Sequence, residues 1–474
     1  MSSTYDVIVI GCGPAGERAA IQAARVGKRV AVVERANVVG GTSVNWGTIP
    51  SKTLRESAML VNRLRRKRLE GFKLEVPERI GVRDFMHRER EVVQRELELI
   101  NETLERNEVE LFRGAARFVD EHTVAVIEDG QVRLRLKAPV ILIATGTRPN
   151  RPEDVPFDDR HVFDASSILR MPVMPRSLMV LGAGVIGIEY AAIFSALGLA
   201  VTLVDTRDEL LPFMDRELAR ILARELRRLG MVLISNDRYE SIEVVEGDEA
   251  EEGSFSGVRC HTRQGNVLEA DALLYTVGRD GNTEDLGLEV LGIEATSRGL
   301  LEVNEHYQTS YSHIYAVGDV IGYPALASTS MEQGRQAMAH ALGVSRPIIR
   351  HDLLPFAIYA VPEVSYVGES EEALRERGVD YVVGRGRYDK NPRGQILNDL
   401  GGMLKLLFER EHETLVGVHI VGTGASELIH LGTALIRLGS TAMQLAELPF
   451  NYPTLSDLYR HAAYGALKEL GHYR

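Results

Sequence analysis

The hydrophobic pattern near the N-terminus predicts a buried strand, a tight turn, a helix and a second strand. Val7–Ile10 is a continuous apolar run of strand length. Small apolar residues then recur at helical spacing across positions 19–24, and Gly27 ends this segment. A second apolar run follows and finishes on Glu34. A strand, a helix and a strand in this order are typical of a parallel α/β unit.

Three glycines with the spacing Gly-x-Gly-x-x-Gly separate the first strand from the helix. Gly11 permits the tight turn, Gly13 lets a pyrophosphate approach the backbone, and Gly16 allows close packing of helix on strand. The start of the helix favours phosphate charge, and Glu34 can accept hydrogen bonds from both ribose hydroxyls. The segment therefore predicts a dinucleotide site, although one copy of this motif is weak evidence.

The same unit recurs later in the chain. Residues 178–207 contain an apolar run, a helix-like segment and a second apolar run that ends on Asp205. The glycine spacing is repeated at Gly182, Gly184 and Gly187, and the interval from the third glycine to the acid is unchanged. Two complete units at one spacing predict two bound dinucleotides rather than two structural glycine turns.

Length and composition exclude several classes of protein. A chain of 474 residues predicts about three domains. The formal net charge of −12 disfavours a nucleic-acid partner, and no apolar run approaches the ~18 residues that cross a bilayer. Only two cysteines occur, which argues against a secreted disulfide scaffold, and no metal-ligand cluster stands out among the 13 histidines. We expect a cytoplasmic protein without a metal, membrane or nucleic-acid partner.

Further motifs extend this pattern over essentially the whole chain. They are GGTSVNWGTIPSK (40–52), ATGTRPN (144–150), YAVGDV (315–320) and NYPTLSD (451–457). With the two glycine units, they resemble the pyridine nucleotide-disulfide oxidoreductases, which include dihydrolipoyl dehydrogenase and glutathione reductase. The resemblance implies an α/β fold with two Rossmann-like domains, one for FAD and one for NAD(H) or NADP(H). It also implies an α+β C-terminal domain that forms a homodimer or a higher oligomer.

The resemblance implies domain bounds and site residues as well. The FAD domain would comprise 1–150 and 279–345, the NAD(P) domain 151–278, and the dimerisation domain 346–474. Asp319 would hold the ribityl chain of the flavin, and Lys52 would pair with Glu189 beside the flavin ring. The other residues implied in nucleotide binding are Arg35, Gly41, Thr42, Ser43, Ala116, Thr145, Gly146, Gly278 and Ala327.

The redox disulfide of the family is missing from this sequence. Ser43 and Thr48 occupy the places of its two cysteines. A hydroxyl forms no disulfide, and its pKa is too high for it to replace a thiolate. Cys12 lies in the first glycine turn and Cys260 in a strand-like stretch, so both are interpreted as small buried residues. We expect an active site without thiol chemistry.

The acid–base histidine of the disulfide reductases is also replaced. Tyr452 stands at its position, and Asp457 stands where the family has the glutamate that orients it. Tyrosine, with a reference pKa of ~10, is a poor proton shuttle at neutral pH. His461 follows Asp457 by one helical turn, so the two form either a relocated acid–base pair or an ordinary surface or interface pair.

Both losses agree with hydride transfer between nicotinamides, which needs no general base. The chain resembles the soluble pyridine nucleotide transhydrogenase branch of the family more than the disulfide reductases. Thr48 and Tyr452 are typical of that branch, whereas Ser43 departs from its usual cysteine. Two alternatives stay open: an NAD(P)H diaphorase or quinone reductase with the same fold, and a non-catalytic redox sensor that binds nucleotides.

The choice of nicotinamide cofactor depends on two residues after the second unit. Asp205 favours NAD(H), because it can accept the ribose hydroxyls and would repel a 2′-phosphate. Arg207 either supplies a cation to that phosphate, which would allow NADP(H), or is a solvated loop arginine. We expect NAD(H) to be the better ligand.

Overall fold

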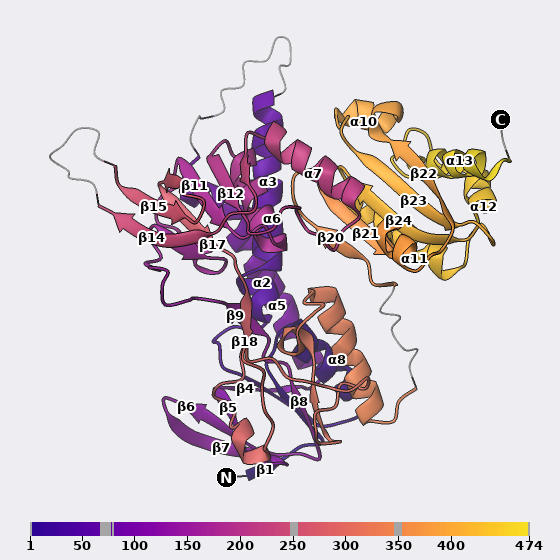
Figure 1. The fold of residues 1–474 in the computed structure, drawn as a ribbon. Coiled ribbons are helices and arrows are strands. Elements are labelled where there is room, and N and C mark those ends of the chain that lie inside the picture. The colour runs from indigo at the N-terminus through magenta and orange to yellow at the C-terminus, as the bar shows by residue number, and fades with distance from the viewer. Residues whose placement is uncertain (1, 67–76, 78–79, 247–254, 346–352, 473–474) are drawn as a thin grey trace.

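The first glycine unit forms the centre of a parallel sheet, as its apolar strands require. A computed structural model describes residues 2–66, 77, 80–246, 255–345 and 353–472 (Figure 1). Helix α1 (Pro14–Arg25) connects the two central strands, whose residues are all buried. The strand order is β19 (Ile314–Ala316), β8 (Val140–Ile143), β2 (Val7–Ile10), β3 (Val30–Glu34) and β4 (Glu110–Arg113).

The second glycine unit repeats this arrangement. Its parallel sheet has the order β10 (Val162–Asp164), β17 (Ala272–Tyr275), β11 (Ser177–Leu181), β12 (Ala200–Val204) and β13 (Val232–Ile234). Helix α6 (Val185–Ala196) connects β11 to β12, as α1 connects β2 to β3. In both units the strand that precedes the glycines is third in the sheet, so each glycine turn lies at the middle of a sheet edge.

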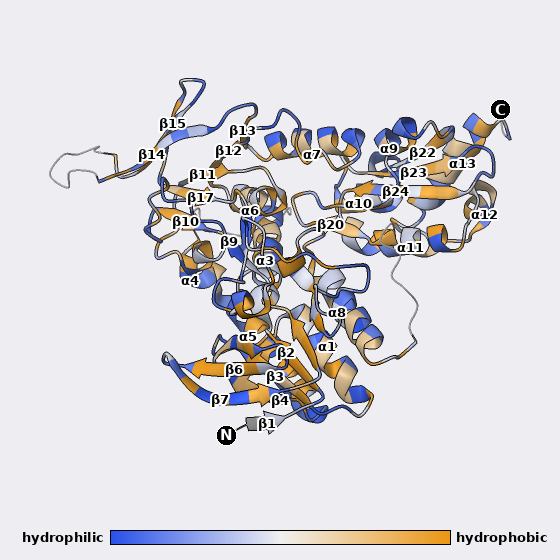
Figure 2. Cartoon of the chain, turned by 60° about the horizontal axis from the view of Figure 1, so that its bottom comes forward, coloured by the Kyte–Doolittle hydropathy of each residue, from blue (hydrophilic) through white to orange (hydrophobic). Residues whose placement is uncertain are grey.

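Smaller sheets and long helices complete the two α/β regions. One sheet has the order β1 (Ser2–Thr4), β7 (Gln131–Lys137), β6 (Thr123–Glu128) and β5 (Ala115–Asp120), and another has β14 (Tyr239–Val245), β15 (Gly257–Thr262) and β16 (Val267–Ala270). The helices are α2 (Gly41–Asn45), α3 (Thr48–Arg66), α4 (Val82–Phe85), α5 (His87–Arg106), α7 (Arg216–Arg228) and α8 (Ala327–Ala341). In the first region, strand β6 is mainly hydrophobic, whereas β7 carries both hydrophilic and hydrophobic residues (Figure 2).

The chain passes between the two α/β regions along one pair of antiparallel strands. These are β9 (Thr147–Pro149) and β18 (Arg279–Gly281), paired from Thr147–Gly281 to Pro149–Arg279. Helix α3 runs from the first region into the second beside this pair (Figure 1). The two glycine units are therefore held side by side by a short ribbon and a shared helix.

The C-terminal region is an antiparallel sheet covered by helices. Its strand order is β20 (Phe356–Ile358), β21 (Val364–Gly368), β24 (Leu415–Val421), β23 (Met403–Glu409) and β22 (Tyr381–Arg387). The helices are α9 (Glu371–Glu376), α10 (Pro392–Leu397), α11 (Ala425–Arg437), α12 (Ala442–Glu447) and α13 (Leu458–Leu470). Short 3-10 helices lie at η1 (Ser167–Arg170), η2 (Leu288–Leu291), η3 (Gly318–Ile321) and η5 (Tyr388–Lys390). None of the helices in the described ranges has the length and apolarity to cross a membrane.

A buried ion-pair cluster joins helix α7 to this C-terminal sheet. Lys405 of β23 is 0% exposed, and its ammonium lies 2.9 and 2.8 Å from the two carboxylate oxygens of Asp215, which caps α7. It also pairs with Glu217, at 3.0 Å, and with Glu371. Since a buried charge is stable only when it is well paired, the cluster fixes the start of α7 against the sheet.

Candidate functional site

The two glycine turns have the same geometry. Gly11 and Gly182 adopt φ values of +99° and +98°, which residues with a Cβ atom rarely adopt. A Cβ on Gly16 would lie 1.9 Å from the Gly11 carbonyl oxygen, and a Cβ on Gly187 would lie 1.9 Å from that of Gly182. Both third glycines are therefore required for the helix to pack on the turn. Gly13 and Gly184 immediately precede α1 and α6, at the ends that favour phosphate.

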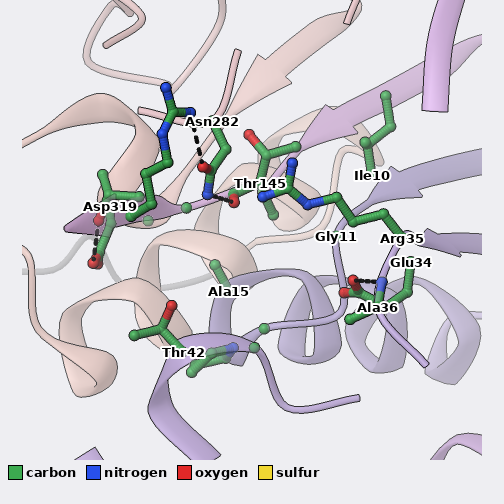
Figure 3. A pocket seen from close by; sticks show the side chains of 18 of the residues that line it. Ile10, Gly11, Ala15, Glu34, Arg35, Ala36, Thr42, Thr145, Asn282 and Asp319 are labelled. Carbon is green, nitrogen blue, oxygen red and sulfur yellow. Dashed lines mark hydrogen bonds between the residues drawn. The ribbon is translucent and has the colours of Figure 1, made fainter. Parts of the chain in front are cut away.

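A cavity of about 400 Å³ lies against the first glycine turn (Figure 3). Most of the residues expected to bind the flavin nucleotide line it. They are Gly11, Gly13, Glu34, Arg35, Gly41, Thr42, Ser43, Thr48, Ala116, Thr145, Gly146, Asp319 and Ala327. Gly16 lies beneath the turn instead, and Lys52 lies one helical turn beyond Thr48 in α3.

Glu34 marks one end of this cavity. Its two carboxylate oxygens each accept one backbone hydrogen bond, from the N–H groups of Cys12 and Ala36, at 2.8 Å. A carboxylate has about four lone-pair directions, so each oxygen keeps one available. Glu34 is thus held rigidly and can still accept two hydroxyl groups, as the ribose of a dinucleotide requires.

Asp319 lies toward the other end in Figure 3, at the start of the short helix η3. Its carboxylate accepts a hydrogen bond from Thr147 Oγ1 at 3.2 Å, and Thr147 is held in turn by Arg279 at 2.8 Å. Asn282 donates its amide to the Thr145 carbonyl at 2.9 Å, whereas the buried Thr145 hydroxyl has no partner within the described residues. This unpaired hydroxyl, the free capacity of Glu34 and the glycine turn fit FAD.

Sequence reasoning did not single out Asn282 or Thr147 as site residues. Asn282 follows strand β18 and Thr147 begins strand β9, so the antiparallel ribbon brings them together at the cavity. Thr147 lies inside the motif ATGTRPN, and Asn282 follows Gly278, which the resemblance implied in nucleotide binding. That motif and Gly278 were the available signal. Gly278 itself lies at the entry to β18, beside Asn150 and Arg298, with a φ of +90°.

No thiol lines the flavin cavity. Ser43 from α2 and Thr48 at the start of α3 supply hydroxyls to its wall. The two cysteines of the chain are free and buried: Cys12 lies within the first glycine turn but is not among the residues that line the cavity, and Cys260 lies in β15. Burial is the main cause that raises the pKa of Cys12 to about 12 and that of Cys260 to about 11. Both thiols therefore stay protonated at neutral pH, and neither replaces a redox disulfide.

Lys52 and Glu189 form an ion pair, and a third segment completes it. The Lys52 ammonium lies 2.6 Å from Glu189 Oε2. The other oxygen of Glu189 accepts the backbone N–H of Tyr359 at 2.8 Å, and the Tyr359 ring centroid lies 5.0 Å from the Lys52 nitrogen. These residues come from α3, α6 and the loop after β20. The pair thus stands where the two nucleotide units and the C-terminal region meet.

Asp205 differs from Glu34 in its surroundings. It accepts the backbone N–H of Ala183 and of Arg207, as Glu34 accepts two backbone donors. The Arg207 guanidinium adds two hydrogen bonds, one to each oxygen, both at 2.8 Å. Burial opposes ionisation of Asp205, but the hydrogen bonds from Arg207 and Ala183, together with the Arg207 charge, lower its pKa. Sequence reasoning offered two roles for Arg207, a cation for the 2′-phosphate or a solvated loop arginine. Neither describes it fully, because its guanidinium forms an ion pair with Asp205.

Tyr452 and Asp457 lie away from the cavity of their own chain, in the C-terminal region. Tyr452 is 74% exposed, whereas Asp457 is buried at the start of α13. His461 Nε2 lies 3.3 Å from an Asp457 oxygen, and Arg460 pairs with the same carboxylate. The Asp457–His461 contact predicted from sequence thus exists, but an arginine shares the carboxylate. A role for these residues in the active site requires a second subunit.

The family described as pyridine nucleotide-disulphide oxidoreductase matches residues 5–334, and the dimerisation domain of the same name matches residues 354–463. The chain belongs to this family. It is therefore an FAD-dependent oxidoreductase of α/β class that uses nicotinamide dinucleotides, which confirms the predicted fold class and the FAD and NAD(P) cofactors. The second match supports the predicted homodimer.

Two relatives and two solved structures extend this result over the full length. The chain is 43% identical to a soluble pyridine nucleotide transhydrogenase of Mycobacterium bovis, over 98% of both chains. It is 42% identical to one from Chromohalobacter salexigens, over 98% of this chain and 99% of that one. LpdA from Mycobacterium tuberculosis superposes with a TM-score of 0.88 at 28% identity, covering 97% and 99% of the two chains. The HOCl-induced flavoprotein disulfide reductase RclA from Escherichia coli gives 0.85 at 28%, with the same coverage.

Proposed function

We propose that this chain transfers hydride between NADPH and NAD⁺ as a soluble, FAD-dependent transhydrogenase. The observation that carries the proposal is the 43% identity, over 98% of both chains, to a relative with that name. The thiol-free cavity supports it, because Ser43 and Thr48 stand where a disulfide reductase needs cysteines. The two glycine units support it as well, since the reaction needs a flavin site and a nicotinamide site.

The residues of this chain would bind, orient and stabilise rather than move protons. When bound, FAD supplies the two-electron carrier between the two nicotinamides. Glu34, Asp319 and the glycine turn would hold it in the cavity. The Lys52–Glu189 pair would place a fixed cation beside the end of the cavity that Thr48 lines. A hydride arrives and a hydride leaves, so the cycle consumes no proton and requires no histidine at the Tyr452 position.

The boundaries and assembly follow from the same proposal. We place the FAD domain at 1–150 and 279–345, the NAD(P) domain at 151–278 and the dimerisation domain at 346–474. The β9–β18 ribbon supports the inner boundaries, because both chain crossings lie there. In a homodimer, or a higher oligomer built from it, Tyr452 and Asp457 would approach the flavin site of the partner subunit. We propose the cytoplasm as its location.

Stopped-flow reoxidation tests this function directly. Purified holoenzyme is reduced with NADPH and then mixed separately with thio-NAD⁺ and with a benzoquinone. We expect rapid recovery of the oxidised flavin absorbance with thio-NAD⁺, in step with the appearance of thio-NADH. Reoxidation by the quinone alone would assign a quinone reductase or diaphorase instead. Slow reoxidation by both acceptors would assign a nucleotide-binding redox sensor.

A further inference from the structure

One face of helix α7 carries arginines toward the second nucleotide unit. Arg216, Arg220, Ala223 and Arg227 recur at i, i+4, i+7 and i+11, which places them on one side of the helix. With Arg207 and residues of strands β12 and β13, they line a cavity of about 160 Å³ that reaches Asp205. In Figure 2 this helix bears both hydrophilic and hydrophobic residues along its length. Its hydrophobic side packs inward through Leu218, Leu222 and Leu226.

Most charges that face this cavity are already paired. Arg207 is bound to Asp205, and Arg216 Nε lies 3.2 Å from Glu209. Asp208 accepts a hydrogen bond from the Asn236 side chain at 2.9 Å. Among the described residues, Arg220 and Arg227 have no ion pair. The cavity therefore contains two guanidinium groups with unused donors, two helical turns apart on one face of α7, with Ala223 between them.

Asp205 has little remaining capacity for ribose hydroxyls. Each of its oxygens accepts two hydrogen bonds, which fills the roughly four lone-pair directions of a carboxylate. Its charge is also balanced by the Arg207 guanidinium at 2.8 Å. The usual repulsion between an acid at this place and a 2′-phosphate is thereby weakened. The sequence places an acid that disfavours NADP(H) at position 205. In the folded protein the Arg207 guanidinium balances the charge of that acid.

We infer that Arg220 and Arg227 form a binding site for the 2′-phosphate of NADP(H), while Arg207 holds Asp205 in a neutral pair. The site deepens the proposed function and rests on it for the identity of the whole dinucleotide. Its chemistry is that of a phosphate monoester dianion beside a ribose, which two guanidinium groups recognise through charge-assisted hydrogen bonds. NADH, which lacks the 2′-phosphate, would bind at the same unit without the contacts to Arg220 and Arg227.

Equilibrium binding of nucleotide fragments to the FAD-loaded full chain tests this site. Isothermal titration compares adenosine 2′,5′-bisphosphate with 5′-AMP, which differ only in the 2′-phosphate. For the wild type we expect the bisphosphate to bind more tightly, with an affinity that falls steeply as salt increases. Arg227→Ala and Arg220→Ala should each weaken the bisphosphate about tenfold and leave 5′-AMP within about twofold.

Arg228→Ala is the matched control. It removes the same side chain from the same helix, off this face, where Arg228 pairs with Glu225 at 2.9 Å. FAD content and thermal midpoint verify that each variant is folded. Equal affinity of the wild type for the two fragments would overturn the inference. So would an effect of Arg228→Ala as large as that of Arg227→Ala.

The fragment assay also separates this inference from the proposed function. Selective loss of bisphosphate binding in Arg227→Ala would establish the phosphate site even if thio-NADH formation failed in the stopped-flow experiment. Conversely, the enzyme could catalyse transhydrogenation while Arg220→Ala and Arg227→Ala leave its affinity for the bisphosphate unchanged. The proposed function would then stand, and the 2′-phosphate would bind elsewhere.

Discussion

The two dinucleotide units of this protein have the same backbone and different electrostatics. Their glycine turns match in φ and in the 1.9 Å approach that excludes a side chain at the third glycine. Their acids differ: Glu34 accepts two hydrogen bonds, whereas Asp205 accepts four, two of them from the side chain of an arginine. We therefore propose that the turn specifies that a dinucleotide binds and that the charges around the acid decide which one.

The difference also changes what an acidic residue implies. An acid after the second strand is ordinarily evidence for NAD(H), because its free oxygens accept the ribose hydroxyls. Glu34 retains that capacity, and Asp205 shares its oxygens with Arg207. Sequence landmarks at the same spacing thus correspond to two chemically different sites.

The largest expected effects come from adding one methyl group to each turn. Gly16→Ala and Gly187→Ala would each place a Cβ in contact with a carbonyl oxygen, so the helix must shift. We expect Gly16→Ala to lose FAD, seen as a colourless protein by absorbance. Gly187→Ala should keep FAD but bind NADH and NADPH at least about 100-fold more weakly by titration. Loss of flavin from Gly187→Ala, or retention by Gly16→Ala, would break the assignment of the two units.

The ion pair between the units should give the next largest effect. Glu189→Gln keeps an oxygen for the Tyr359 N–H but removes the charge that holds the Lys52 ammonium. Hydride transfer from NADPH should slow by about 10- to 100-fold, measured by stopped-flow flavin absorbance, with FAD content unchanged. Lys390→Met, at an exposed lysine of η5, is the control and should leave the rate unaltered. An unchanged rate in Glu189→Gln would remove this pair from the mechanism.

A matched pair of acid-to-amide changes sharpens the comparison directly. Glu34→Gln should weaken FAD about tenfold in a reconstitution assay, because it removes charge from an acceptor with free capacity. Asp205→Asn should change NADH affinity less than about threefold, since Arg207 already occupies its oxygens. An equal loss from both substitutions would contradict the proposed difference between the acids.

The pH dependence of Asp205 provides a further check on that difference. Hydrogen bonds from Arg207 lower the pKa of Asp205 below its ordinary value of 3.8, despite the opposing effect of burial. Because a lowered pKa keeps the carboxylate charged above 3.8, its pairing is present from there upward and is lost only as pH falls through the lowered value. NADH affinity measured between pH 5 and 8 should therefore show no step from this group.

The smallest expected effect is that of thiol reagents. Burial raises the pKa of Cys12 and Cys260 to about 12 and about 11, so both stay protonated at pH 8. Iodoacetamide should leave the native protein unlabelled by mass spectrometry, with full activity. Two labels should appear after denaturation in guanidinium. Rapid loss of activity on native labelling would falsify the view that this site operates without thiols.

Much of the fold follows from local sequence patterns. Apolar strands such as Val7–Ile10, glycine spacing and the acid after the second strand specify each unit, because they act over one turn, one helix and one strand. The same holds for Ser43 and Thr48, whose positions within one motif place both on the cavity wall. The family resemblance also predicted the Lys52–Glu189 pair, which spans distant parts of the chain.

Other contacts between distant segments were decided by the tertiary structure. Asn282 and Thr147 meet at the cavity only because β9 pairs with β18, and Tyr359 completes the Lys52–Glu189 pair from the loop after β20.

By itself, the sequence determined that this protein has two dinucleotide units and hydroxyl side chains at the two places of the family's redox cysteines, since both depend on residue types at fixed local spacing. The tertiary structure decided which charged side chains surround Asp205 in the second unit. It directs Arg207 onto Asp205 and brings the arginine face of α7 against the same cavity. The physical reason is that electrostatic interactions depend on distance and burial in three dimensions, which spacing along the chain does not specify.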